Sequence, residues 1–262
     1  MMYSRTCKVF LVATLLVLVA GCATRGVNQP LAQTQNFAKA LAQTQTENGK
    51  GKVLLLAPDV NLFELSAGGQ RERVPDWNNK AKDHINATLR DAFRTSKSFE
   101  VVEAPALTAD EQLTLDEHIA LYVRVGGEAF SKTATNDAAW KHKRDDFDYT
   151  LGSGLAYLRE RTGADVALVT VASDTYRSAG NKVLTGLVMV AGAAVGVAIV
   201  PGSTPAFMTI GLIELRTGHI QWLNFASQGM MTDMRERDGA NSLVTATLKP
   251  LLTPTAPPAV AP

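Results

Sequence analysis

Apolar residues in the first half of the chain follow the periods that distinguish strands from helices. Residues 52–57 form a mostly apolar run that ends at Pro58, which is typical of a strand buried on both faces. Over residues 76–95 apolar side chains recur every three or four positions, which predicts a helix with Asp76 as its capping residue. Residues 99–103 then predict a short strand.

The middle of the chain continues this alternation. We expect a second helix over residues 109–121, although residues 122–125 fit either helix or extended chain. A third helix is expected over residues 150–161, with Gly163 as its stop signal. A buried strand follows directly at residues 166–172.

The last part of the chain predicts a hairpin and a helix. Residues 207–215 and 220–226 read as strands joined by a turn at 216–219, and residues 239–252 form the final helix. Strands that alternate with helices and end in a hairpin indicate an α/β (α+β) fold, with a single mixed sheet covered by helices.

A Gly/Ala-rich apolar insertion precedes this hairpin. Residues 183–200 carry no charge and have Thr185 as their only polar side chain. As a helix they would be about 27 Å long, close to the thickness of a bilayer core. Gly192 and Gly196 fit the small-xxx-small pattern of close helix contacts. Two alternatives stay open: a helix or hairpin buried on the domain or on another subunit, and an element that touches the membrane.

The amino terminus has the features of a secretory signal. Arg5 and Lys8 precede the uncharged residues 9–19, a run too short to be a permanent membrane span. We therefore expect this segment to direct export and then to be removed.

The end of that run, Leu-Val-Ala-Gly-Cys at residues 18–22, resembles the lipobox of bacterial lipoproteins. The resemblance implies cleavage between Gly21 and Cys22, and a covalent diacylglycerol and N-acyl lipid (palmitate) on Cys22. In the sorting rules of that family an aspartate after the cysteine favours the inner membrane. Ala23 therefore favours the periplasmic face of the outer membrane.

Cleavage changes the charge and the thiol content of the chain. Loss of Arg5 and Lys8 leaves 24 basic residues against 25 acidic ones, a net charge of −1. Such a balance provides no clustered positive charge for nucleic acid. Cys7 leaves with the signal and Cys22 takes the lipid, which excludes disulfides, thiolate metal sites and a cysteine nucleophile.

Four segments follow from these patterns. Residues 1–21 are the signal peptide and residues 22–50, rich in Gln, Thr, Asn and Ala, are the lipidated cysteine and a flexible tether. A short amphipathic helix within the tether is the alternative. Residues 51–252 have the size of one domain, and residues 253–262 form a Pro/Ala tail expected to be disordered.

Three short features of the folded part carry a family resemblance: Thr-Gly-Ala-Asp at residues 162–165 before a buried strand, Glu-Leu-Arg-Thr-Gly at 214–218, and Trp222 in the next strand. Over residues 50–252 the chain resembles a superfamily of periplasmic lipoproteins. It includes the curli secretion-channel lipoprotein, the amino-terminal domain of the Tol-system propeller protein, and the lipoprotein activators of peptidoglycan synthases. The resemblance implies a non-catalytic partner of envelope machinery.

Candidate catalytic chemistry is sparse. His84, His118, His142 and His219 have no metal-ligand spacing, and the sequence contains no HExxH, GxSxG or phosphate-loop motif. The mixed charges of residues 141–148 are better explained by a solvated loop than by a metal or acid/base site. We expect no enzyme activity, no metal and no cofactor.

The three tryptophans, Trp77, Trp140 and Trp222, are candidates for lining a glycan groove. Trp77 belongs to a helical apolar stripe and Trp222 to a hairpin strand, which favours core packing for both.

Two functional hypotheses remain. The first is a membrane-anchored adaptor, assembly factor or activator that binds the bilayer through Cys22 and an envelope protein through its folded domain. The second is an oligomeric export or pore component, a homo-oligomer that uses residues 183–200 to assemble or to enter the membrane.

Overall fold

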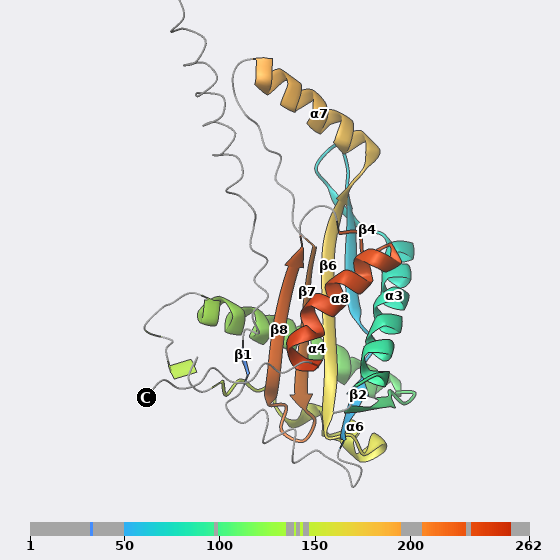
Figure 1. Cartoon of the computed structure of the whole chain (residues 1–262), viewed down its shortest axis with the longest axis vertical. Helices are drawn as coiled ribbons and strands as arrows, with labels where there is room; N and C mark the ends of the chain where they lie inside the picture. The colour runs from blue at the N-terminus through green and yellow to red at the C-terminus, as the bar shows by residue number, and fades with distance from the viewer. Residues whose placement is uncertain are drawn as a thin grey trace, which may run out of the picture.

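The computed structural model describes residues 32–33, 50–96, 99–134, 139, 142–143, 147–194, 206–228 and 232–252. They contain one eight-stranded mixed sheet with the strand order β1-β8-β7-β6-β2-β5, and with β3 and β4 joined to it through β6 (Figure 1). The predicted α/β fold is confirmed. The strands are β1 (Ala32–Gln33), β2 (Gly51–Leu55), β3 (Asp59–Leu65), β4 (Arg71–Arg73), β5 (Phe99–Glu103), β6 (Val166–Arg177), β7 (Ala206–Glu214) and β8 (Ile220–Gln228).

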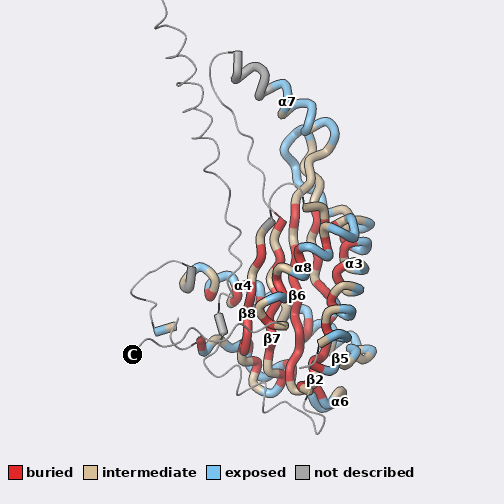
Figure 2. The backbone as a smooth tube through the Cα atoms, viewed as in Figure 1, coloured by how far each residue is buried: buried red, intermediate tan, exposed pale blue. Residues whose placement is uncertain are grey.

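Helices cover both faces of this sheet. One buried cluster joins α3 and α8 to the sheet, and the other joins α4, the 3-10 turn η2 and α6 to the opposite face. Buried residues concentrate along the strands, whereas α7 lies beyond one end of the sheet (Figure 2). The helices are α3 (Pro75–Arg94), α4 (Ala109–Ala134), η2 (Ser153–Leu155), α6 (Ala156–Thr162), α7 (Ala179–Ala194) and α8 (Arg237–Leu252).

The long strand β6 organises the sheet. Its first half pairs in parallel with β2, where Val53 lies opposite Val166, and its second half pairs in parallel with β3, where Asp59 lies opposite Val171. Pro58 separates β2 from β3, because it has no N–H to donate to a ladder. The β3 and β6 strands therefore continue past β2 and lead to α7.

The start of α3 differs from the prediction. Asp76 does not cap the helix: Val74 is the N-cap, without a side-chain cap bond, and Asp76 lies in the first turn. Pro75 explains the shift, since proline suits the first helical position and forces the residue before it into extended backbone.

Helix α4 is longer than predicted, and the extended alternative for residues 122–125 is wrong. Its buried side chains Leu115, Tyr122 and Ala129 repeat every seven positions, so one apolar stripe continues through this segment. The helix starts with a reciprocal capping box, in which Thr108 N–H donates to Glu111 and Glu111 N–H donates to the Thr108 hydroxyl.

The third helix begins later than residue 150. Thr150 instead forms an isolated bridge with His219, and the helical turns start at Ser153. The helix ends at Gly163, which has a left-handed φ of 68° and confirms the predicted stop.

The predicted C-terminal hairpin is confirmed. Strands β7 and β8 are antiparallel, with Leu212 opposite Trp222. Its turn requires glycine at Gly218, which has a φ of 71°; a Cβ there would lie 1.9 Å from the carbonyl oxygen of Gly152. Strands β1, β3 and β4 were not predicted. Strand β1 lies within the segment expected to be a flexible tether and pairs antiparallel with β8.

Candidate contact site

Helix α7 projects from the end of the β3 and β6 strands, at the top of Figure 1. Polar groups fix its first turns to the body of the protein. The Asn181 side-chain amide donates to the carbonyl oxygen of Ser66 at 2.9 Å, and Arg177 donates to the Thr185 hydroxyl at 3.4 Å. Asn181 and Thr185 are one helical turn apart, so one polar face of α7 is turned toward the protein.

Three apolar side chains in the first turns of α7 are exposed. Val183 is 65% exposed, Leu184 46% and Leu187 63%. An ordinary surface helix of a globular protein turns its apolar face to the core and its polar face to water. Over residues 181–187, the described part of its side chains, α7 has the reverse orientation: polar groups contact the protein and apolar side chains are exposed.

The described part of residues 183–200 is helical, and its side chains at Val183, Leu184 and Leu187 are exposed. Gly192 lies within α7, whereas Gly196 lies outside the described residues. Within the described part of the chain, no helix has the length and apolar character needed to cross a membrane.

An apolar cavity of about 210 Å³ lies between α4 and the face of the sheet. Its walls come from α4, β6, β7 and β8. The lining is almost wholly apolar and aromatic, and its main residues are Tyr122, Gly126, Gly127, Phe130, Phe207 and Phe225. We refer to it below as the α4 cavity.

The polar atoms at the bottom of the α4 cavity already have partners. The hydroxyl groups of Tyr122 and Thr209 lie 3.0 Å apart, and Thr209 also donates to the Asn224 carbonyl at 3.2 Å. Complete burial raises the pKa of the Tyr122 phenol, which therefore stays neutral. The cavity offers an apolar surface and no charge.

The edge of the α4 cavity contains two consecutive glycines. A Cβ at Gly127 would meet no atom within 4 Å, and one at Gly126 would lie 3.8 Å from Leu223, an ordinary contact. By contrast, a Cβ at Gly211 would lie 2.6 Å from the Tyr122 ring. Gly211 is therefore required by the packing of this chain, whereas Gly126 and Gly127 are not.

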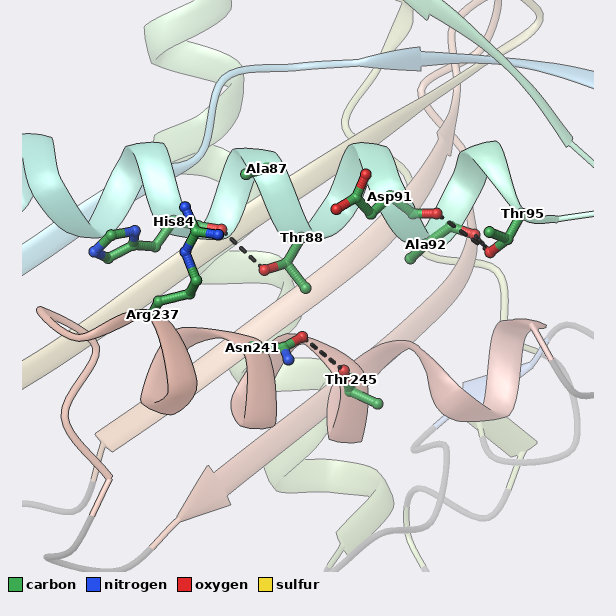
Figure 3. A pocket seen from close by; sticks show the side chains of 9 residues that line it. All are labelled: His84, Ala87, Thr88, Asp91, Ala92, Thr95, Arg237, Asn241 and Thr245. Atoms are coloured by element: carbon green, nitrogen blue, oxygen red, sulfur yellow. Dashed lines mark hydrogen bonds between the residues drawn. The ribbon is translucent and has the colours of Figure 1, made fainter.

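A polar groove of about 400 Å³ runs between α3 and α8 on the other face (Figure 3). Its threonine hydroxyls are used inside the helices: Thr88 donates to the His84 carbonyl at 2.9 Å, and Thr245 lies 3.4 Å from the Asn241 side-chain oxygen. The lining also contains the side chains of His84 and Asp91, with Arg237 at one end.

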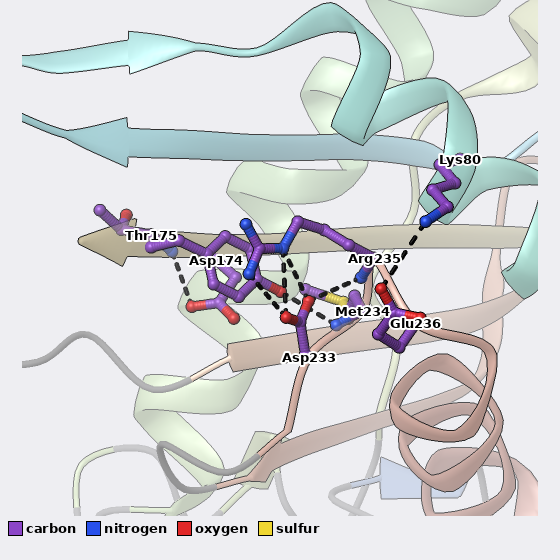
Figure 4. Close-up of polar contacts among 8 residues, drawn as sticks. Lys80, Asp174, Thr175, Asp233, Met234, Arg235 and Glu236 are labelled. Carbon is purple, nitrogen blue, oxygen red and sulfur yellow. Dashed lines mark hydrogen bonds and ion pairs between the residues drawn. The ribbon is translucent and has the colours of Figure 1, made fainter. Parts of the chain in front are cut away.

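An ion pair between Arg235 and Asp233 lies in the segment before α8 (Figure 4). The Arg235 guanidinium donates to both carboxylate oxygens of Asp233, at 2.9 and 2.6 Å. Its central carbon lies 4.5 Å from the ring centre of Trp77 and 3.9 Å from that of Tyr176. This cluster joins α3, β6 and the start of α8, and its groups satisfy one another.

Two carboxyl groups near this cluster have opposite pKa shifts. Burial raises the pKa of Asp174, which is 7% exposed, although the Thr175 N–H donates to it at 2.6 Å. Burial by itself also raises the pKa of Asp233, but the hydrogen bonds from Arg235 outweigh it and hold that pKa below its usual value.

The candidates for catalytic and glycan-binding chemistry are dispersed. Within the described ranges, no group of three or more His, Cys, Asp or Glu side chains is placed to hold a metal. His118 Nδ1 lies 2.7 Å from the Thr114 carbonyl, and His219 Nε2 lies 3.2 Å from the Phe147 carbonyl. Trp222 is fully buried, which confirms its core role.

Several predicted features lie outside the described residues: Gly21, Cys22, most of the tether, Trp140, the tail and half of the 141–148 stretch. In that stretch Lys143 forms an ion pair with Asp148. The α4 cavity is the main feature that the sequence analysis missed. Its only local signal was the Gly126-Gly127 pair, which is unusual inside a helix.

No protein-family model and no curated protein matches the chain. Similar solved structures include a single-substitution variant of the PelC dodecamer from Paraburkholderia phytofirmans, at 15% identity over 78% of this chain and 89% of that chain, with a TM-score of 0.34. A second PelC dodecamer structure gives 14% identity, 79% and 91% coverage, and a TM-score of 0.35.

The LpoB C-terminal domain from Salmonella enterica gives 12% identity over 76% of this chain and 96% of that domain, with a TM-score of 0.28. At TM-scores of 0.28 to 0.35, these likenesses carry no information about the activity or assembly of this chain.

Proposed function

We propose that this chain is a lipid-anchored periplasmic protein that acts by binding other envelope proteins, as an adaptor, assembly factor or activator, and not by catalysis. The observation that carries the proposal is the reversed orientation of α7. Its polar side holds it to the body through Asn181, while Val183, Leu184 and Leu187 face outward. A fixed helix that presents apolar side chains to water is typical of an interaction surface.

The anchor proposed from the sequence fits this role. Lipid on Cys22 would hold the chain at the outer membrane, on its periplasmic face, and residues 22–50 would set how far the folded domain reaches. The direct partner then lies in the periplasm or at a membrane surface. The proposal requires no cofactor beyond the covalent lipid.

The second candidate function is an oligomeric export or pore component. It is favoured by the position of α7 at the end of the molecule, where an apolar helix with Gly192 can reach another subunit or a bilayer.

One substitution set tests the contact role of α7. Changing Val183, Leu184 and Leu187 together to Gln keeps good helix residues while it removes the apolar face. The matched control is Leu113→Gln on α4, a leucine that is 59% exposed on another surface. We expect the triple variant, and not the control, to lose the chain's crosslinked adducts in intact envelopes while keeping its melting temperature. An unchanged adduct pattern contradicts the proposal.

Vesicle flotation separates the two candidates. The mature chain with Cys22→Ser lacks the lipid, so any binding to phospholipid vesicles must come from the protein surface. No flotation supports the adaptor role, and flotation that the triple Gln variant abolishes supports the membrane-entering one.

A further inference from the structure

A cleft of about 590 Å³ opens at the carboxyl ends of the parallel strands β2 and β5. From β2 the chain passes through β3 and β4 to α3 on one face of the sheet, and from β5 it enters α4 on the opposite face. Neighbouring parallel strands whose connections go to opposite faces leave a crevice between their ends, and open α/β sheets bind ligands in such a crevice. We refer to it as the β2/β5 cleft.

The walls of the β2/β5 cleft are largely apolar and poor in backbone donors. Pro58 and Pro105 lie in the two connections, and proline has no N–H to donate. Neither connection contains the glycines of a phosphate-binding loop, whose N–H groups surround the anion. The cleft is therefore poorly suited to a nucleotide or a phosphate. Its apolar side chains come from the end of β2, the connection after β5 and α4: Leu56, Leu107, Leu115 and Ile119.

Two side chains of opposite charge line the cleft without a partner. Asp59 begins β3 and Lys82 lies on α3, and both are half-buried. Within the described part of the chain, neither side chain forms an ion pair or a hydrogen bond. A charge that is partly removed from water without a partner is unfavourable, so each group attracts an ion of opposite sign.

We infer that the β2/β5 cleft binds a small zwitterionic ligand of the amino-acid and short-peptide class. The ammonium group of the ligand pairs with Asp59, its carboxylate pairs with Lys82, and its apolar part contacts Leu115 and Ile119. A ligand with a single charge would leave one of the two protein groups unpaired, which favours a zwitterion over a simple amine or acid. The inference goes beyond the proposed contact role and does not depend on α7.

The volume of the cleft suits a short peptide. Ligand sites are typically clefts of about 300–1,000 Å³. One water molecule takes up about 30 Å³ of liquid, so the 590 Å³ of the cleft corresponds to roughly 20 non-hydrogen atoms. A tripeptide such as Ala-Leu-Ala, with free ends and one apolar side chain, is of this size.

A second carboxylate lies on the α4 side of the opening. The Gln112 amide donates to Asp116 Oδ1 at 2.8 Å, and both residues are exposed. The other carboxylate oxygen of Asp116 makes no contact with the described residues. The opening therefore has more negative than positive charge, which favours entry by the amino end of the ligand.

Calorimetric titration of the mature Cys22→Ser chain with four forms of Ala-Leu-Ala tests the inference. The forms are the free peptide, the N-acetylated peptide, the C-amidated peptide and the doubly blocked peptide. We expect the free peptide to bind with a Kd tighter than about 1 mM, and each blocking group to weaken binding by at least about fivefold. No binding of the free peptide in this range, or equal binding of the free and doubly blocked forms, overturns the inference. This comparison needs no variant in the cleft, so it does not depend on how a substitution affects folding.

Two substitutions assign the charges. Asp59→Asn should weaken binding of the free peptide and abolish the effect of N-acetylation, whereas Lys82→Gln should abolish the effect of C-amidation. The matched controls are Asp83→Asn and Lys80→Gln, two exposed residues of α3 that do not line the cleft, and both should bind like the wild type. A blocking effect that persists undiminished in its matching variant overturns the inference.

Methyl NMR locates the bound peptide. Signals of Leu115 and Ile119 should shift on titration, whereas Leu223 in the α4 cavity should not, and the reverse pattern overturns the inference. The triple Gln variant of α7 should bind the peptide like the wild type, because Asp59 lies opposite Val171 in the middle of β6 and α7 follows the end of that strand. Failure of the contact role therefore appears in the envelope crosslinks, and failure of the ligand site appears in the titration.

Discussion

Gly127→Ala should make the folded chain more stable. Glycine in a helix interior is about 0.8–1 kcal/mol less favourable than alanine. Gly127 is exposed in the middle of α4, and an added Cβ meets no atom within 4 Å, so neither strain nor new packing offsets this gain. We therefore expect the free energy of unfolding to rise by about 1 kcal/mol, which corresponds to a rise of roughly 2–4 °C in melting temperature for a chain of this size.

Urea unfolding of the mature Cys22→Ser chain, at concentrations where it is monomeric, measures this change. The midpoint should rise and the m-value should stay the same. Gly218→Ala is the matched control with the opposite sign, because a Cβ there would lie 1.9 Å from the Gly152 carbonyl oxygen. If Gly127→Ala leaves the stability unchanged or lowers it, the position is covered or not helical, and the description of an open α4 cavity is wrong.

Three further substitutions test the packing and the charges. Gly211→Ala should lose about 1–3 kcal/mol of stability in urea unfolding, because its Cβ would lie 2.6 Å from the Tyr122 ring; a neutral result would mean that the ring moves freely. Asn78→Ala should lose about 1–3 kcal/mol, because the buried Leu62 N–H donates to Asn78 Oδ1 at 2.6 Å and would lose its partner; Asn78→Asp, which keeps the acceptor, is the control. Asp174→Asn should gain thermal stability relative to the wild type as the pH rises from about 4 toward neutrality. Because the pKa of Asp174 is raised in the folded state, its stabilising contribution is lost as the pH rises through that folded-state pKa. A stability difference between the variant and the wild type that stays constant across the pH range would contradict this.

The sequence pattern predicts elements well where one face is buried and the period is regular. The stripe through Ala81, Ile85 and Leu89 defines α3, and the buried runs of β6 and β7 define the centre of the sheet. Strand β3 has the same kind of signal, since Val60 and Leu62 alternate with polar residues, but the pattern is too short to stand out beside the run before Pro58.

Boundaries and caps depend on competition between neighbouring residues. Asp76 is a good capping residue, yet Pro75 occupies the first helical position and moves the cap back to Val74. Gly126 and Gly127 would be expected to end α4, and the helix continues because Tyr122 and Ala129 bury the same stripe on either side of them. At such positions tertiary packing outweighs the helix propensity of the individual residues.

The functional surfaces were only partly predictable from the sequence. A hydrophobic pattern shows which face of a helix is apolar, but not whether that face packs on the domain or points outward. The apolar character of α7 is plain in the sequence, but an apolar stripe normally predicts a buried face. The hydrogen bonds between Asn181 and Ser66 and between Arg177 and Thr185 hold the polar face of α7 against the protein, so the exposed apolar side chains point outward. Asn181 and Ser66 are far apart in the sequence, so no local pattern predicts their contact. The α4 cavity likewise combines three strands and one helix, so no local window contains it.

The reversed face of α7 also constrains how the protein can work. If α7 evolved only to close the chain between β6 and β7, polar substitutions at Val183, Leu184 and Leu187 would carry no penalty in the single molecule, since these side chains make no core. Exposed apolar side chains reduce solubility and invite nonspecific association. A fixed helix that keeps them in spite of this is best explained by a surface that is covered in the working assembly.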